Sequence, residues 1–109
     1  MPYTIILAPE AVEDLKALRA FERATVREAI KEHLRFAPTK TSKSRIKRLR
    51  GMRQTEYRLR VDDIRVFYDV TEHTVEILAI ISKAEAAAWL ERYGAQDEEQ
   101  SEPDEENYS

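Results

Sequence analysis

The sequence predicts an α+β fold: an N-terminal strand, a helical hairpin, an antiparallel twisted sheet of three or four strands, and a C-terminal helix. Apolar residues recur at helical spacing across residues 9–37 and alternate with polar residues across 55–70, and an N-cap motif at Ser82 follows the last strand. Sequential strands joined by short turns pair antiparallel. We therefore expect helices on one side of the sheet and a free second face.

The N-terminal part begins with a short β-branched and aromatic run, Tyr3–Leu7, which predicts the first strand. Pro9 is suited to the start of a helix, and an apolar stripe follows it at helical spacing: Ala11, Val12, Leu15 and Leu18. A second stripe ends near Pro38 and contains Val26, Ala29, Ile30, His33, Leu34 and Ala37. Together they predict a helical hairpin, with His33 at the margin of the core.

The C-terminal part holds the sheet. Residues 38–48 are polar and basic and predict a loop. Strands are predicted around Leu49–Met52 and at Thr55–Val61, Ile64–Val70 and Thr74–Ile81. Ser82 with Glu85 three residues later forms a capping box, so a helix should begin there and run through Tyr93, with Gly94 as its stop.

Length and charge divide the chain into two parts. At 109 residues there is room for one modest core, which we place in a domain of residues 1–94. Residues 95–109 are acidic and poor in apolar side chains, so we expect a disordered tail. Without the seven carboxylates of residues 97–109, the net charge of −3 becomes +4, from 18 basic and 14 acidic residues.

Composition also narrows the kind of site. There is no cysteine, and two histidines, His33 and His73, are too few to predict a metal centre. No apolar run is long enough to cross a membrane, and no basic leader precedes an apolar region, so we expect a cytoplasmic protein. Residues 40–65 hold ten basic residues against three acidic ones, which indicates an anionic partner.

The stretch YRLRVDDIRVFY predicts a hairpin whose two faces differ. If Asp62-Asp63 is a two-residue turn, Arg60 lies opposite Arg65 and Arg58 lies opposite Phe67. The core face would then hold Tyr57, Leu59, Val61, Ile64, Val66, Tyr68 and Val70. Directly opposed like charges are unfavourable in a sheet, so the arginines either solubilise an exposed face or form an anion site. The aromatic ring of Phe67 beside them favours single-stranded RNA as the anion.

Several of these segments resemble the RelE/ParE superfamily of toxins from type II toxin-antitoxin systems. The resemblance covers residues 1–93 in element order and is carried by Leu49-Arg50-Gly51-Met52, Tyr57-Arg58-Leu59-Arg60, Ile64-Arg65-Val66-Phe67-Tyr68 and Val75–Ser82. RelE-like members of that superfamily cut messenger RNA on the ribosome without a metal or other cofactor. ParE-like members inhibit DNA gyrase instead.

The resemblance implies roles for particular residues. Arg58, Arg60, Arg65 and Lys83 fall where RelE-like proteins place basic catalytic residues, with Arg65 on the phosphate-binding arginine. An RNA-binding surface is further expected from Lys43, Arg45, Lys47, Arg48, Arg50, Arg53, Phe67 and Trp89. The implied partners are a cognate antitoxin protein, the ribosome and messenger RNA, and operator DNA through the antitoxin, with no membrane.

Trp89 departs from the RelE pattern, which has a tyrosine for proton transfer near this position. Indole has only a non-acidic N–H and cannot replace it. Trp89 could stack on a base, or it could anchor the last helix on the sheet. Three functions therefore stand open: a ribosome-dependent mRNA endonuclease, a gyrase inhibitor without nuclease activity, and a catalytically degenerate member that binds RNA or an antitoxin.

Overall fold

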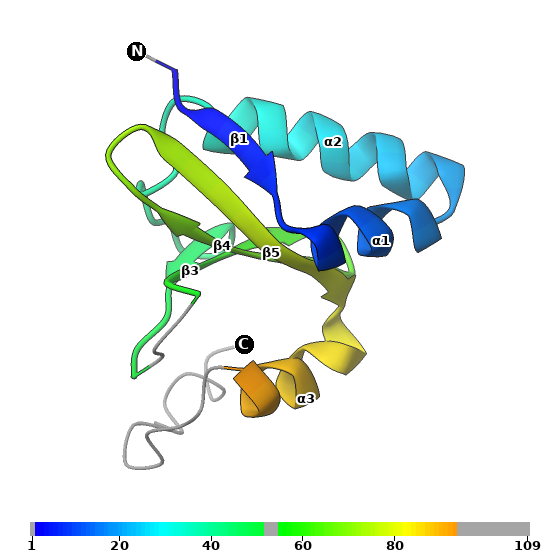
Figure 1. Cartoon of the computed structure of the whole chain (residues 1–109). Helices are drawn as coiled ribbons and strands as arrows, with labels where there is room; N and C mark the ends of the chain where they lie inside the picture. The colour runs from blue at the N-terminus through cyan, green and yellow to red at the C-terminus, as the bar shows by residue number, and fades with distance from the viewer. Residues whose placement is uncertain (1, 52–54, 94–109) are drawn as a thin grey trace.

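A computed structural model describes residues 2–51 and 55–93, and it confirms the α+β class (Figure 1). The elements are β1 (Thr4–Leu7), α1 (Pro9–Ala17), α2 (Ala20–Leu34), β2 (Ile46–Arg48), β3 (Tyr57–Val61), β4 (Ile64–Val70), β5 (Thr74–Ser82) and α3 (Lys83–Tyr93). Gly94 and the tail of residues 95–109 lie outside the described residues. No helix within the described ranges is both long and apolar enough to span a bilayer.

The sheet has five strands in the order β1-β5-β4-β3-β2, one more than the largest number predicted. The extra member is β1, which pairs in parallel with β5, placing Ile5 beside Val75. All other neighbouring strands are antiparallel. The pairing of β1 spans some seventy residues of chain, so local sequence patterns could not reveal it.

Helices cover both faces of the sheet, which corrects the expectation of a free second face. The hairpin of α1 and α2 lies on one side, and α3 lies on the other (Figure 1). The hairpin side buries the main core, which includes Leu15, Ile30, Leu59, Val66, Tyr68 and Ile77. The α3 side buries Phe67 and Ala79, two apolar residues that strand alternation points away from that core. Exposing these two side chains to water would cost free energy, and α3 covers them.

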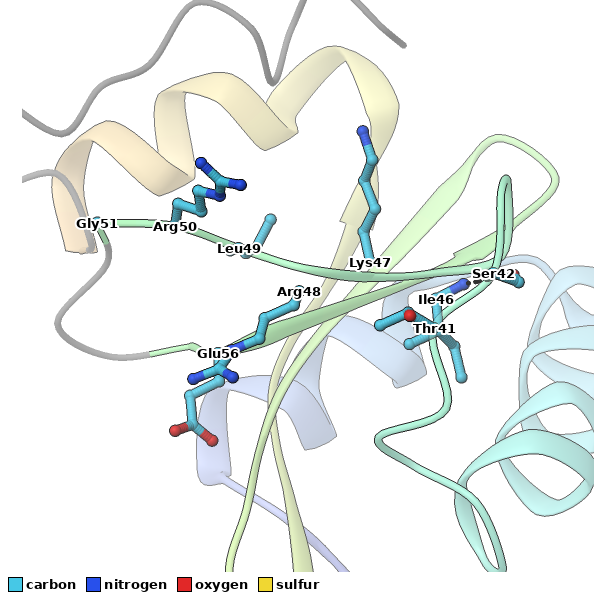
Figure 2. A pocket seen from close by; sticks show the side chains of 9 residues that line it. All are labelled: Thr41, Ser42, Ile46, Lys47, Arg48, Leu49, Arg50, Gly51 and Glu56. Atoms are coloured by element: carbon cyan, nitrogen blue, oxygen red, sulfur yellow. Dashed lines mark hydrogen bonds between the residues drawn. The ribbon is translucent and has the colours of Figure 1, made fainter.

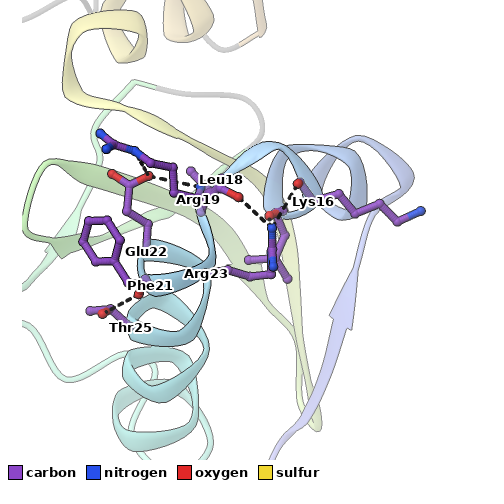
Figure 3. Close-up of polar contacts among 8 residues, drawn as sticks. Lys16, Leu18, Arg19, Phe21, Glu22, Arg23 and Thr25 are labelled. Carbon is purple, nitrogen blue, oxygen red and sulfur yellow. Dashed lines mark hydrogen bonds and ion pairs between the residues drawn. The ribbon is translucent and has the colours of Figure 1, made fainter.

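One arginine side chain joins the two helices of the hairpin through hydrogen bonds. Pro9 is the first residue of α1, as predicted, but α2 begins at Ala20, six residues before the start of the predicted stripe. The Arg23 side chain of α2 reaches back to the end of α1, where Nη2 donates to the Leu18 carbonyl at 2.7 Å and Nε to the Leu15 carbonyl at 3.2 Å (Figure 3). These bonds satisfy carbonyls that the end of a helix leaves without partners.

The first strand of the antiparallel sheet differs from its predicted position. The prediction of a strand around Leu49–Met52 is wrong, because β2 occupies Ile46–Arg48. Ile46 pairs with Leu59 and is 4% exposed, so it supplies the core residue at this edge. Because basic residues surround this single apolar position, the sequence pattern does not indicate a strand there. The following chain, up to Gly51, lies outside the ladder.

Candidate nucleic-acid interface

The hairpin of β3 and β4 has the predicted register. Arg60 lies opposite Arg65 and Arg58 lies opposite Phe67 across a two-residue turn at Asp62-Asp63. Asp62 has a φ of 53°, the kind of positive value that tight hairpin turns need. The three arginines therefore belong to the sheet face that also carries α3.

Arg65 is fixed against the turn. Its side chain is buried, with 7% of the residue exposed, and Nη1 donates to the carbonyls of Asp62 at 2.9 Å and Ile64 at 3.2 Å. Burial lowers the pKa of the guanidinium, and the nearby charge of Arg60 lowers that pKa further, while Asp63 opposes both effects. The result is a rigid cation at the base of the turn.

Arg60 and Arg58 differ from Arg65 in exposure. Arg60 is exposed, and its side chain forms no hydrogen bond or ion pair with the described part of the chain. Arg58 is half-buried and lies between Lys47 on β2 and Phe67 on β4 in one row across the sheet. Because directly paired residues share a face, Lys47 extends the basic row to the edge of the sheet.

Lys83 is brought to the turn by its own backbone. As the first residue of α3, it donates its N–H to the Asp63 carbonyl at 2.8 Å. The Ser82 hydroxyl accepts the N–H of Glu85 at 3.3 Å, which confirms the predicted N-cap. Arg60, Arg65 and Lys83 thus gather at the turn end of the sheet, and Arg58 lies one row further along.

Phe67 does not offer the accessible ring that was expected for RNA. It is 1% exposed and stacks on Trp89 of α3, with ring centroids 4.8 Å apart and planes inclined by 16°. The physical reason is burial of apolar surface, because the two rings cover each other where α3 crosses the sheet. The alternative role for Trp89, an anchor of the last helix, is the one that this contact supports.

The basic loop residues do not form one continuous surface. Lys43 and Arg45 are exposed before β2, whereas Arg53 lies outside the described residues. In Figure 2, Lys47 and Arg50 point toward α3, and Arg48 points the opposite way. The Arg48 guanidinium lies over the Tyr57 ring at 5.7 Å. Strand alternation explains the split between Lys47 and Arg48.

An open hollow of about 640 Å³ runs along this edge strand (Figure 2). Three basic residues line it, Lys47, Arg48 and Arg50, together with Glu56 as the one acid among its lining residues. The lining residues of this hollow therefore carry a net positive charge. Such a surface favours a polyanion over a small apolar ligand.

The chemistry available on this face is cationic. No histidine lies on it, since His33 is on α2 and His73 is between β4 and β5. The described residues contain no group of three His, Cys, Asp or Glu suited to a metal ion. The Tyr68 hydroxyl points into the core, where it donates to the Pro38 carbonyl at 2.7 Å, and burial raises its pKa. The face can therefore bind phosphates and stabilise negative charge.

Comparison with known families gives one match that spans most of the domain. Residues 5–87 match the family model described as the ParE toxin of the type II toxin-antitoxin system parDE. No curated protein matches the chain significantly.

Solved structures share the fold over almost their whole length. The RelBE2 toxin-antitoxin complex of Mycobacterium tuberculosis is 26% identical, with a TM-score of 0.62, and the match covers 75% of this chain and 99% of that one. The archaeal RelE-RelB complex of Pyrococcus horikoshii is 24% identical, with a TM-score of 0.62 and coverage of 76% and 97%. A mutant of the E. coli toxin RelE in the free state is 20% identical, with a TM-score of 0.63 and coverage of 82% and 92%.

Proposed function

Because the chain belongs to the ParE toxin family of type II toxin-antitoxin systems, we propose that it is a toxin that cuts messenger RNA on the ribosome. The observation that carries this proposal is the gathering of Arg60, Arg65 and Lys83 at one end of the sheet, with Arg58 in the next row. Three arginines on one face of a small domain, with Lys83 close to their turn, match the charge of a phosphate backbone.

The proposed reaction needs no metal. The ribose 2′-oxygen attacks the adjacent phosphorus, the bond from phosphorus to the 5′-oxygen breaks, and the products are a cyclic 2′,3′-phosphate and a 5′-hydroxyl. One proton leaves the 2′-hydroxyl and one is added to the 5′-oxygen, so the reaction neither consumes nor releases protons overall. Arg65 and Arg60 would hold the phosphate and stabilise its added negative charge, with Lys83 beside them. Arginine stays protonated and cannot take the proton from the 2′-hydroxyl. The base would then come from outside these arginines, which is consistent with a reaction that depends on the ribosome.

A cognate antitoxin is the proposed protein partner. Two of the structurally similar proteins reported above are described as complexes, a RelE-RelB complex from Pyrococcus horikoshii and a toxin-antitoxin complex from Mycobacterium tuberculosis. An acidic segment of the antitoxin on the face of Arg58, Arg60 and Lys47 would neutralise the charges that RNA needs. The pair would then bind operator DNA through the antitoxin.

A second candidate function is inhibition of DNA gyrase without nuclease activity. Two observations favour it: the matching family model is named for ParE, and Trp89, expected near the position of the RelE tyrosine, packs on Phe67. In this function the basic face would contact a protein or DNA, with no bond broken.

Mapping of messenger RNA ends by reverse transcription after induced expression separates these functions. Wild type should give cuts within translated codons, and the cuts should vanish in Arg65→Ala and Arg60→Ala. Arg60 is the safer position, because no hydrogen bond of the described fold involves its side chain. Arg27→Ala, which removes the same charge from an exposed position on α2, is the matched control and should still cut. Growth arrest with DNA-damage signalling and no cuts would establish the gyrase function instead.

A further inference from the structure

A second hollow, of about 320 Å³, lies between α2 and the end of β3. It exists because β2 pairs only with Tyr57–Leu59, so the last residues of β3 extend past the end of that strand. Six residues with polar side chains line it: Thr25, His33, Ser44, Arg45, Arg60 and Asp62. Its volume is at the lower end of the range for small-ligand sites.

One wall of this hollow is a single side of α2. Thr25, Ala29 and His33 are spaced by four residues and therefore lie in one row along the helix. The His33 side chain keeps 22% of its surface exposed, so it borders the hollow as well as the core. The Thr25 hydroxyl donates to the Phe21 carbonyl at 2.9 Å and contributes shape instead of a donor (Figure 3).

The opposite wall carries Arg45 and Arg60, whose backbones are joined by a hydrogen bond. The N–H of Arg60 donates to the Arg45 carbonyl at 2.8 Å. Both side chains are exposed, and neither makes a hydrogen bond or ion pair within the described ranges. Asp62 is the one acid among the residues that line the hollow. With two arginines and one acid among them, the lining residues have a net positive charge.

We propose that this hollow binds a phosphate group, with Arg45 and Arg60 as its charged ligands and the Ser44 hydroxyl and the His33 ring as further ligands. The donors come from a helix, a loop and a strand, and a tetrahedral phosphate can accept from such different directions, whereas a planar carboxylate offers two oxygens. The inference rests on the proposed function where the phosphate is a diester of bound RNA. Arg60 would then contribute to two phosphate positions, one beside Arg65 at the turn and one beside Arg45 past the end of β2.

Binding of a fluorescent oligouridylate of about twelve nucleotides, measured by anisotropy over a series of salt concentrations, tests this site. Arg45→Ala should weaken binding at low salt by about threefold to tenfold. It should also reduce the slope of log affinity against log salt by about 0.7, the change expected when the protein neutralises one phosphate fewer on a single strand. Arg27→Ala removes the same charge from an exposed position on another side of α2, away from Thr25 and Ala29, and should change neither quantity. Equal behaviour of the two variants would overturn the proposal.

Amide NMR distinguishes the sources of the phosphate and separates this inference from the proposed function. Inorganic phosphate or the oligouridylate should shift the signals of Ser44, Arg45 and Arg60. Shifts with inorganic phosphate alone would assign the hollow to a free phosphate. Shifts of these signals caused by an acidic peptide, with no effect of either phosphate probe, would overturn the proposal in favour of a protein partner. If RNA affinity falls in Arg58→Ala but not in Arg45→Ala, the phosphate site in the hollow is rejected and RNA binding by the basic face still stands. If RNA affinity depends on Arg45 but no messenger RNA is cut in the mapping experiment, only the endonuclease function is rejected.

Discussion

Arg60 and Arg65 lie directly opposite each other on β3 and β4, and the Arg65 guanidinium bonds the carbonyls of its own turn while Arg60 stays exposed. Like charges in this relation destabilise a sheet, and the charge of Arg60 lowers the pKa of Arg65 in addition to the effect of burial. A chain selected only for stability would place a neutral or acidic residue at one of the two positions. We propose that the pair serves to bind a polyanion.

Replacing Arg60 should therefore stabilise the fold while it weakens RNA binding. In urea unfolding, Arg60→Thr should raise the free energy of unfolding by about 0.2–1 kcal/mol at low salt, because it removes the opposed charge and adds a β-branched residue. The gain should shrink at high salt, which screens the repulsion. Arg48→Thr is the matched control on β2, and it should destabilise slightly because it removes the cation above the Tyr57 ring. A lower stability of Arg60→Thr would contradict the repulsion argument.

Trp89 should hold α3 on the sheet through its stack on Phe67. Trp89→Ala should lower the free energy of unfolding by about 1–3 kcal/mol, since it removes a partly buried ring and an aromatic pair. Circular dichroism is the suitable probe, because the variant no longer has the chain's single tryptophan. Phe21→Ala is the control: Phe21 is 64% exposed and should matter by less than about 0.5 kcal/mol. An equally small effect at Trp89 would show that α3 does not depend on the stack.

The Tyr68 hydroxyl should support the loop before β2. Tyr68→Phe removes its bond to the Pro38 carbonyl and leaves that buried acceptor without its donor, so it should cost about 1–3 kcal/mol in urea unfolding. Tyr57→Phe, in the ring that stacks on Tyr68 at 5.5 Å, is the matched control and should cost much less. Similar destabilisation in both variants would assign the effect to the rings instead of the hydroxyl.

Asp14 should make stability depend on pH in the direction opposite to a salt-bridged acid. Burial raises the pKa of Asp14, its bond from the Ile80 N–H partly opposes that, and Glu10 and Glu85 raise it further. The folded state then binds more protons than the unfolded state, so this group's contribution is greatest below the unfolded pKa of about 3.9 and declines as pH rises through the folded pKa.

The Asp14 prediction is tested with an amide that accepts the same hydrogen bond without a charge. Asp14→Asn should be at least as stable as wild type near pH 7, and the difference should disappear by about pH 3, where the wild-type carboxyl is neutral. Glu13→Gln, at an exposed neighbouring position of α1, is the matched control. An advantage of Asp14→Asn that grows as pH falls would contradict the direction of the pKa change.

Local patterns predicted the elements that depend on neighbouring residues. The alternation of Ile64–Val70 placed β4 with correct ends, and the Asp62-Asp63 turn fixed the pairing of Arg60 with Arg65. The N-cap at Ser82 placed the start of α3. Where one apolar residue carries a strand, as Ile46 does in β2, the surrounding charges concealed it. The roles assigned to Arg58, Arg60, Arg65 and Lys83 stay predictions.

The sequence by itself determined the class of fold and which hairpin residues share a face, because side-chain alternation and turn length are local properties. Only the tertiary structure decided what covers that face. Alternation alone leaves the Phe67 ring open, and it is covered because α3, some twenty residues later, brings Trp89 onto it. The hollow between His33 and Arg45 likewise exists only because α2 packs beside the free end of β3. Contacts between distant segments depend on the burial of surface in three dimensions, which periodicity along the chain does not encode.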